Sequence, residues 1–317
     1  MGISDFFYLA IFLSVIGSIA CILLLFVEKV MRAGLPFLLY LSIVFFFSVP
    51  LAMPDATLFY HDPTRIEAFK TAAIVWIIGL GISVSFILVR VFAAHMAIKK
   101  YAGCTTERVR AVYDECLGKV KLRHTPTILY GKIKEPACVI TTWRSYVVLR
   151  EEIIKDLTDD ELKTVLTHEL LHIKRKHTVL QKVFDFVCSI HWFNPIVWIG
   201  RHEFSSACEI DCDRSVLRVF GEEIQAIAYA KVMVRLMELA AMRRKSLRGT
   251  LGALDFWAAK HRISNLLNKP SKLRKAFSVF ACAVIICGTA WLSADFSRSY
   301  FYPYNGTNNG TEWSETE

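Results

Sequence analysis

His168-Glu169-Leu170-Leu171-His172 is the most informative stretch of this sequence, because its spacing is typical of a zinc site on a helix. Two histidines four positions apart on a helix project from one face about one turn apart, so both imidazoles can reach a single Zn²⁺. Glu169 lies between them and can take a proton from a water molecule bound to that zinc. The alternative is a chance match, in which a helix carries two surface histidines. The rest of the sequence has to decide between these readings.

The flanks of this motif predict a helix. Thr158-Asp159-Asp160-Glu161 has the form of a capping box, which starts a helix by satisfying its first free N–H groups. Apolar residues then recur at helical spacing, namely Leu162, Val165, Leu166, Leu170 and Ile173. The two histidines are therefore expected on an amphipathic helix.

A catalytic zinc site needs a third protein ligand and keeps its fourth position for water. Glu209 offers a carboxylate downstream, and Asp213 lies one helical turn further on the same face. There Asp213 could hydrogen-bond the distal nitrogen of a zinc histidine. The competing donors are Cys208, Cys212 and Asp211. Two thiolates and two histidines would close the tetrahedron and make the site structural, so we favour Glu209 and expect both cysteines to be buried and reduced.

Three motifs in order, HELLH at 168–172, WFNPIVW at 192–198 and ACEIDCD at 207–213, resemble the membrane-embedded M56 metallopeptidases. These are the protease domains of the BlaR/MecR β-lactam sensor-transducers, and the resemblance covers roughly residues 1–295. It implies a gluzincin site, in which the ligands are His168, His172 and Glu209, the catalytic base is Glu169 and the supporting acid is Asp213.

A shorter match follows the glutamate motif. Lys260-His261-Arg262-Ile263 resembles the basic stretch that these peptidases carry there. The resemblance makes His261 and Arg262 candidate contacts to the substrate or the transition state.

The composition is that of a polytopic membrane protein, with 54% hydrophobic residues and a net charge of +9. Residues 6–27 carry no charge and are long enough to cross about 30 Å of hydrocarbon. Further spans are expected at 35–53, 72–97 and 276–294. The predicted fold class is a polytopic α-helical membrane protein with four transmembrane helices and an α+β gluzincin zinc-peptidase domain.

Basic residues predict the orientation. Residues 98–275 hold 32 Lys and Arg against 20 Asp and Glu, and Lys99 and Lys100 directly follow the third span. Cytoplasmic flanks are rich in Lys and Arg, so this segment is expected in the cytoplasm of a bacterial cell. The expected order is three spans in 1–97, a cytoplasmic metallopeptidase domain in 98–275, the fourth span in 276–294 and a short tail in 295–317. Both termini are then outside.

Residues 183–200 are apolar enough to suggest another span, but several residues argue against one: Asp185, His191, Asn194 and Pro195. An extra crossing would also separate Glu209 from the two histidines by the membrane. We expect a buried or membrane-grazing helix that turns at Asn194-Pro195.

The nine cysteines are odd in number, form no CxxC pair and avoid the expected outside loops. They are therefore expected to be reduced and without disulfides.

The soluble region is expected to begin with a helix over 106–121, followed by strands at 125–130, 137–142 and 145–149. In related zinc peptidases an edge strand beside the zinc helix binds the substrate as an added strand, which makes the 137–149 hairpin the candidate here. Arg150 and Trp143 stand where the family usually has proline, which bears on substrate preference. The alternative is a hairpin with a purely structural role.

Other features remain open. Arg243-Arg244-Lys245 with Arg248 is either a regulatory or self-cleavage loop, as the resemblance suggests, or a patch facing anionic headgroups. Three histidines, His177, His191 and His202, are expected to be helix and core residues rather than further ligands. Asn305-Gly306-Thr307 and Asn309-Gly310-Thr311 have the form of glycosylation sequons but are read as part of a polar tail.

Two classes of function are expected. The first is a zinc endopeptidase with one Zn²⁺ per chain that makes limited cytoplasmic cleavages in signal transduction, as in antibiotic-response regulation. The second is a non-catalytic membrane transmitter or scaffold with a structural zinc. Glu169 favours the first, because a structural site has no use for a base.

The expected partners are the lipid bilayer and a cytoplasmic protein substrate, either a transcriptional repressor or the chain itself. A second copy of the chain, as a homodimer, is a further candidate, and direct nucleic-acid binding is not expected. Relatives of this kind carry a penicillin-binding sensor domain after the last span, and its SxxK and KTG-type motifs do not occur after residue 294. Three alternatives follow: a family member without that domain, a shortened form of a longer protein, or a chain that receives its signal from a separate partner protein.

Overall fold

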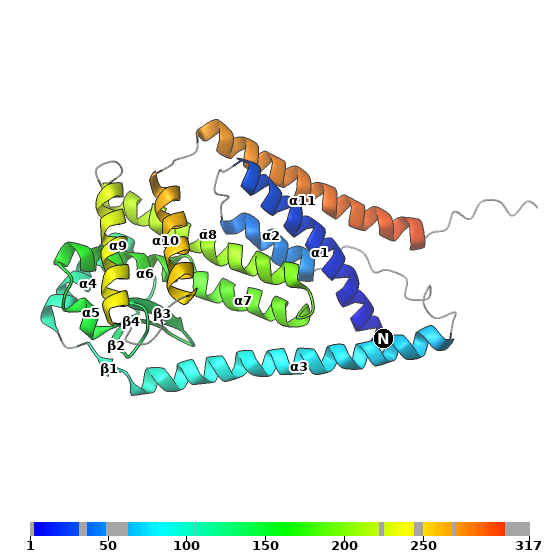
Figure 1. Cartoon of the computed structure of the whole chain (residues 1–317), viewed down its shortest axis with the longest axis horizontal. Helices are drawn as coiled ribbons and strands as arrows, with labels where there is room; N and C mark the ends of the chain where they lie inside the picture. The colour runs from blue at the N-terminus through cyan, green and yellow to red at the C-terminus, as the bar shows by residue number, and fades with distance from the viewer. Residues whose placement is uncertain are drawn as a thin grey trace, which may run out of the picture.

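The computed structural model describes residues 3–31, 37–48, 63–104, 106–221, 225–243, 250–267 and 271–301. Within these ranges the chain is mostly helical, with one small sheet at one end of the molecule (Figure 1). The basic loop at 244–249, the sequons and residues 54–62 of the expected outside loop 54–71 lie outside the described residues.

Among the described residues, three helices are long and apolar enough to cross a membrane: α1 (Ile3–Met31), α3 (Pro63–Lys100) and α11 (Lys272–Phe301). Their candidate spans are Phe6–Val30, Glu67–Lys100 and Lys272–Trp291. Helix α2 (Phe37–Ser48) is apolar but has only 12 residues, and the remainder of the expected 35–53 span is not described. These helices fit a membrane protein, and the number of four spans stays a prediction.

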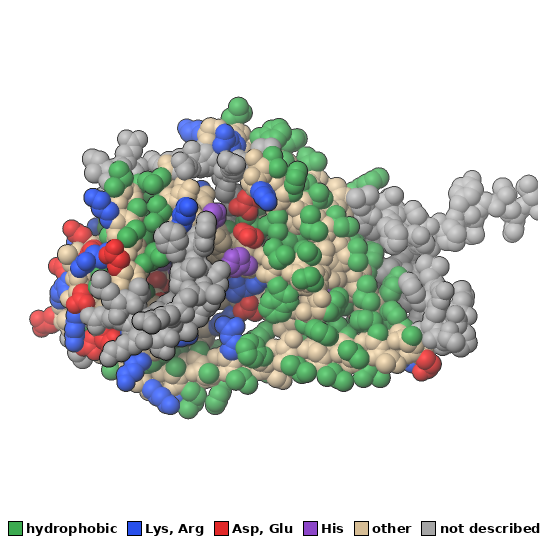
Figure 2. All heavy atoms as spheres, viewed as in Figure 1, with side chains coloured by type: hydrophobic (Ala, Val, Ile, Leu, Met, Phe, Trp, Pro, Cys, Tyr) green, Lys and Arg blue, Asp and Glu red, His purple; other side chains and the backbone are tan. Residues whose placement is uncertain are grey.

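The surface divides into two kinds. Apolar side chains cover the part of the molecule formed by α1, α3 and α11, whereas charged side chains gather over the end that carries α4 (Glu107–Val120) and the sheet (Figure 2). Ile82 and Phe86 on α3 are 67% and 63% exposed, which would be costly in water but is favourable against lipid.

The sheet contains β1 (Ala102–Gly103), β2 (Thr127–Tyr130), β3 (Ala137–Thr141) and β4 (Ser145–Leu149), in the order β1-β2-β4-β3. β3 and β4 form an antiparallel hairpin, and β2 runs parallel to β4. The three longer strands and α4 lie where the sequence predicted them. β3 is at the edge of the sheet, as the substrate hypothesis requires.

Helix α6 (Asp159–Lys174) carries the HELLH motif and packs against the sheet. Thr158 accepts a 3.3 Å hydrogen bond from the Glu161 N–H, and Glu161 accepts one of 2.8 Å from the Thr158 N–H, which confirms the capping box. Leu162, Leu166 and Leu170 are fully buried. Each buried leucine stabilises the fold by about 1.5–3 kcal/mol, so this apolar stripe fixes the rotation of α6 about its axis.

Helices α7 (His177–Ile190) and α8 (Pro195–Phe220) form a helical hairpin, and the break expected at Asn194-Pro195 is where α8 begins. Asn194 caps α8 by accepting a 2.9 Å hydrogen bond from the Ile196 N–H. Its amide nitrogen also donates to the hydroxyls of Ser14 and Ser18 on α1, at 2.6 and 2.8 Å. The turn is therefore satisfied by polar groups of a candidate span.

The end of this hairpin lies between α3 on one side and α1 and α2 on the other (Figure 1). Trp76 on α3 donates a 2.9 Å hydrogen bond to the Ile190 carbonyl, and Trp192 donates one of 3.3 Å to the Trp76 carbonyl. A Cβ atom on Gly79 would lie 2.3 Å from the Trp192 ring, so only glycine permits this contact. The hairpin thus links the zinc-motif region to the candidate spans.

Helices α9 (Gln225–Arg243) and α10 (Thr250–Leu267) pack on each other and on α8. A short helix that the sequence analysis did not predict, α5 (Glu151–Ile154), follows the sheet. All nine cysteines are free, as expected.

Candidate metal centre

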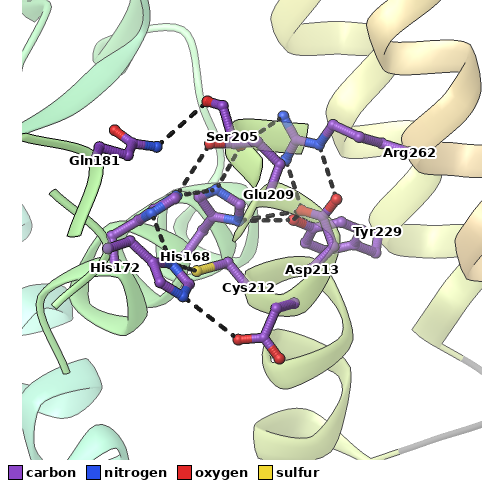
Figure 3. Close-up of polar contacts among 11 residues, drawn as sticks. His168, His172, Gln181, Ser205, Glu209, Cys212, Asp213, Tyr229 and Arg262 are labelled. Atoms are coloured by element: carbon purple, nitrogen blue, oxygen red, sulfur yellow. Dashed lines mark hydrogen bonds and ion pairs between the residues drawn. The ribbon is translucent and has the colours of Figure 1, made fainter. Parts of the chain in front are cut away.

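Three donor atoms converge between α6 and α8 (Figure 3). The Nε2 atoms of His168 and His172 are 3.1 Å apart. Nε2 of His168 lies 3.4 Å from Oε2 of Glu209, and Nε2 of His172 lies 3.4 Å from Oε1 of the same carboxylate. A tetrahedral zinc ion with bonds of about 2.0–2.1 Å holds its donors about 3.3–3.4 Å apart. The two histidines are buried, each 8% exposed, so they are not the surface pair of the alternative reading. The donor types and their spacing fit zinc.

Asp213 lies on the far side of His168, where the sequence analysis expected it. Its Oδ1 atom is 3.2 Å from His168 Nδ1, and the carboxylate is fully buried. Tyr229 on α9 donates a 2.5 Å hydrogen bond to Oδ1 of Asp213, and its hydroxyl is 3.2 Å from His168 Nδ1. This arrangement leaves Nε2 of His168 directed at the centre.

Arg262 on α10 holds the two acidic residues together. It donates to both oxygens of Asp213, from Nε at 2.8 Å and from Nη2 at 2.6 Å, and its Nη1 atom is 3.2 Å from Glu209. A bidentate pair of this kind has a defined geometry as well as strength. Arg262 is therefore in the centre, while the neighbouring His261 is exposed and contacts Asn265 at 3.2 Å. Contact of either residue with a substrate stays a prediction.

The protein environment favours a positive charge at this centre. Burial alone would raise the pKa of Glu209, but the His168 hydrogen bond and Arg262 lower it to about 2. Burial alone would lower the pKa of His168, but the carboxylates of Asp213 and Glu209 raise it to about 10. Arg262 likewise holds the pKa of Asp213 well below its usual range, against the effect of burial.

Glu169 lies on α6 between the two histidines and is half-buried. Burial raises the pKa of its carboxyl to about 7, an effect that the nearby Glu209 carboxylate reinforces and that His168 opposes. A carboxyl group with a pKa near neutrality can both accept and release a proton under physiological conditions.

A second group of donors shares His172. It consists of His172 Nδ1, His177 Nδ1 at 3.2 Å from it, and Cys212 Sγ, which is 3.4 Å from His177 Nδ1. Because this group uses the other ring nitrogen of His172, Cys212 cannot replace Glu209 at the same ion. Burial also raises the pKa of Cys212, which keeps it as a thiol. Of the other competing donors, Cys208 belongs to neither group and Asp211 pairs with Arg175 at 2.7 Å.

Two contributors were not foreseen from the sequence. Tyr229 stands sixteen positions after Asp213 in a helix with no recognisable motif, so no sequence signal marked it. His177 was expected to be a core histidine, and it is fully buried, but its contact with His172 was missed.

The edge strand β3 exposes part of its backbone. Arg150 N–H donates to the Pro136 carbonyl and Thr142 N–H to the Arg144 carbonyl, so the even-numbered residues of this hairpin pair with β4. Because this pairing alternates along an antiparallel strand, Ala137, Val139 and Thr141 turn their peptide groups away from β4. The Thr141 carbonyl accepts a hydrogen bond from Lys182 on α7, so the open part of the edge is at Ala137 and Val139. Trp143 at the hairpin tip is 98% exposed.

A buried centre of two histidines and a carboxylate, set between helices that adjoin candidate membrane spans, fits the class of membrane-associated metallopeptidases. The family model of the BlaR1 peptidase M56 matches residues 52–266, and this chain belongs to that family. It is thus a BlaR/MecR-type membrane protein, and the relatives that it resembles are bacterial.

Individual relatives are distant. The regulatory protein BlaR1 of Bacillus licheniformis is 22% identical over 214 residues, which cover 67% of this chain and 35% of that protein. The methicillin resistance mecR1 protein of Staphylococcus aureus is 24% identical over 182 residues, or 54% of this chain and 30% of that protein. A regulatory protein BlaR1 of Staphylococcus aureus is 21% identical over 238 residues, which cover 73% of this chain and 40% of that protein. This chain therefore matches well under half the length of these relatives.

Proposed function

We propose that this chain is a membrane-embedded zinc endopeptidase that makes limited cleavages on the cytoplasmic side of a bacterial membrane as a step in signal transduction. His168, His172 and Glu209 are the zinc ligands, and Glu169 is the general base. The observation that carries this proposal is the convergence of the two histidines and Glu209: the two Nε2 atoms are 3.1 Å apart, and each lies 3.4 Å from one of the two Glu209 carboxylate oxygens. The family of the chain, a peptidase family, supports it.

The residues around the centre have different roles in peptide hydrolysis. Zinc held by the three ligands would polarise the scissile carbonyl and make a water molecule more acidic. Glu169 accepts the proton of the attacking water and passes it to the leaving amine, a transfer suited to a carboxyl group with a pKa of about 7. Asp213 and Arg262 keep the ligands oriented throughout.

The open edge of β3 is suited to hold the substrate. Val139 offers an N–H and a carbonyl that β4 does not use, and β3 packs beside the zinc helix α6. A peptide that pairs with this edge lies extended next to the zinc ligands, and main-chain hydrogen bonds align it without requiring a particular sequence. Side chains near the hairpin, including Trp143, would then select among substrates.

The substrate is a cytoplasmic repressor-like protein or the chain itself. The names of the relatives, a regulatory protein and a methicillin resistance protein, support a role in regulated signalling. The hairpin of α7 and α8 is enclosed by candidate spans, and confinement next to a bilayer favours limited cleavage over general digestion.

The alternative is a non-catalytic signal transmitter with a structural zinc. Structural zinc sites have four protein ligands. Among the described residues, the Nε2 cluster comprises three donors, and Cys212 lies on the opposite side of the His172 ring. The observed donor set therefore favours a site with an open position.

The test compares cells that express the wild type with cells that express Glu169→Ala, by mass spectrometry of new protein N-termini. Cleavage of a regulatory protein, or a cut within residues 240–256 of the chain itself, should occur only with the wild type. If the wild type binds zinc and produces no Glu169-dependent N-terminus, the alternative of a structural zinc is correct.

A further inference from the structure

Each of the two metal-binding histidines has a partner at its other ring nitrogen. His168 has Asp213 and Tyr229. His172 has His177, whose Nδ1 atom lies 3.2 Å from Nδ1 of His172. Asp213 was expected from its spacing to Glu209 and from the family resemblance, whereas the contacts of Tyr229 and His177 come only from the structure.

The connection between α6 and α7 determines where His177 lies. It contains only Arg175 and Lys176, and Lys176 has a φ of 57°, in the left-handed region that residues other than glycine rarely adopt. This turn reverses the chain, so that His177, the first residue of α7, faces back to His172 and is fully buried. A strained backbone position is maintained where the surrounding contacts require it.

The proton positions follow from the metal-binding geometry. If Nε2 of His172 binds a metal, its Nδ1 carries the ring proton and needs an acceptor. The facing atom is Nδ1 of His177, which must then be unprotonated, with the ring proton of His177 on Nε2. That Nε2 atom is 3.7 Å from Oδ2 of Asp211, too long for a direct hydrogen bond but close enough for the carboxylate to favour this tautomer.

Asp211 is itself held in place, because Nη1 of Arg175 lies 2.7 Å from its Oδ2 atom. Arg175, Asp211, His177 and His172 thus follow one another as a row of polar groups that leads to the centre, with separations of 2.7, 3.7 and 3.2 Å. It is the counterpart of the chain from Arg262 through Asp213 to His168 on the other side.

We propose that His177 is a positioning residue that accepts the Nδ1 proton of His172 and so fixes the tautomer with Nε2 free for the metal. The inference rests on the proposed function in that it takes His172 as a ligand. The competing use of the same atoms is a second metal site formed by His172, His177 and Cys212. That site would require His172 to bind through both nitrogens, and it becomes an outcome of the test.

The test uses the full chain purified in detergent, with His177→Ala, His177→Asn and, as a control, His202→Ala on the exposed face of α8. Zinc affinity is measured by competition with a chelator, and the ligand geometry by the visible spectrum of bound Co²⁺. His177→Ala should weaken zinc binding about 10–100-fold and alter the Co²⁺ spectrum, in line with the loss of an outer-shell partner. His177→Asn should recover most of the affinity, because the Asn Oδ1 atom takes the place of His Nδ1. His202→Ala should match the wild type.

Three results would overturn the inference. Wild-type affinity and spectrum in His177→Ala would show that no acceptor is needed. Equal losses of zinc affinity in His177→Ala and His177→Asn would assign the effect to packing. A second zinc ion per chain that is absent from Cys212→Ser would establish the competing metal site. Failure of the proposed function looks different: the wild type would bind no zinc, or His172→Ala would bind it as tightly as the wild type.

Discussion

Arg262 on α10 and Asp213 on α8 are joined by two hydrogen bonds, of 2.8 and 2.6 Å, that use both oxygens of the carboxylate. Asp213 is fully buried and contacts His168, so the pair connects the metal centre to the helix that precedes α11.

Loss of this pair should destabilise the protein. Arg262→Ala leaves the Asp213 charge buried without its partner, which costs about 3–5 kcal/mol. Arg262→Lys should cost less but not be neutral, because lysine cannot form the bidentate contact. The control is Arg235→Ala, which removes a half-exposed contact of 3.3 Å to Glu161 and should cost under about 1 kcal/mol. Unfolding of the metal-free proteins measures both, and equal shifts would contradict the assigned importance of Arg262.

Substitution of the proposed base should separate binding from catalysis. Glu169→Ala should retain one zinc per chain, because Glu169 is not among the three converging donors. Its rate of substrate cleavage should fall at least about a hundredfold, the usual scale for removal of a general base. Metal analysis and a cleavage assay on the same preparation test this. Cleavage at the wild-type rate would refute the assignment.

The identity of the third ligand can be tested with three variants. Glu209→Ala should lose both zinc and activity, whereas Cys208→Ser and Cys212→Ser should each keep one zinc. The reason is that, among the described residues, the carboxylate that faces both histidines is that of Glu209, with one oxygen 3.4 Å from Nε2 of His168 and the other 3.4 Å from Nε2 of His172. Elemental analysis of the purified variants gives the answer, and a cysteine variant that loses zinc while Glu209→Ala keeps it would reverse the choice.

The open edge of β3 predicts a selective effect of proline. Val139→Pro removes an N–H group that β4 does not use, so the protein should still fold and bind zinc. It should cleave its substrate at least about tenfold more slowly, because one hydrogen bond to the substrate, of about 1.5 kcal/mol, is lost. Ile140→Pro removes an N–H that pairs with β4 and should instead lower the thermal stability. Unchanged cleavage by a folded Val139→Pro variant would argue against strand addition at this edge.

The orientation can be tested by labelling single cysteines in a variant without the nine native ones. An impermeant reagent applied to intact cells should label cysteine at position 64 or 310 and leave one at position 246 unlabelled. The reason is that residues 98–275, with their excess of basic residues, are expected on the cytoplasmic side. Labelling of Ser246→Cys in intact cells would place the metal centre on the other side of the membrane.

Local features of the fold were accessible from the sequence. The capping box at Thr158 and the leucine repeat predicted α6, and the strands at 137–149 were predicted within one residue of their observed ends. Such features depend on hydrogen bonds and periodicities within a few residues, so the sequence records them directly. The two-residue strand β1 was missed because so short a segment has no alternation to detect.

The HELLH motif and the spacing to Glu209 and Asp213 determined which residues to consider for the metal centre, because helical periodicity alone puts each pair on one face. Only the tertiary structure decided their partners. Tyr229 and Arg262 reach Asp213 through the packing of α9 and α10 on α8, and no local pattern encodes contacts between elements so far apart in the chain. His177 stands only five positions after His172, yet its ring faces back because Lys176 adopts a left-handed conformation, which depends on the packing around the turn.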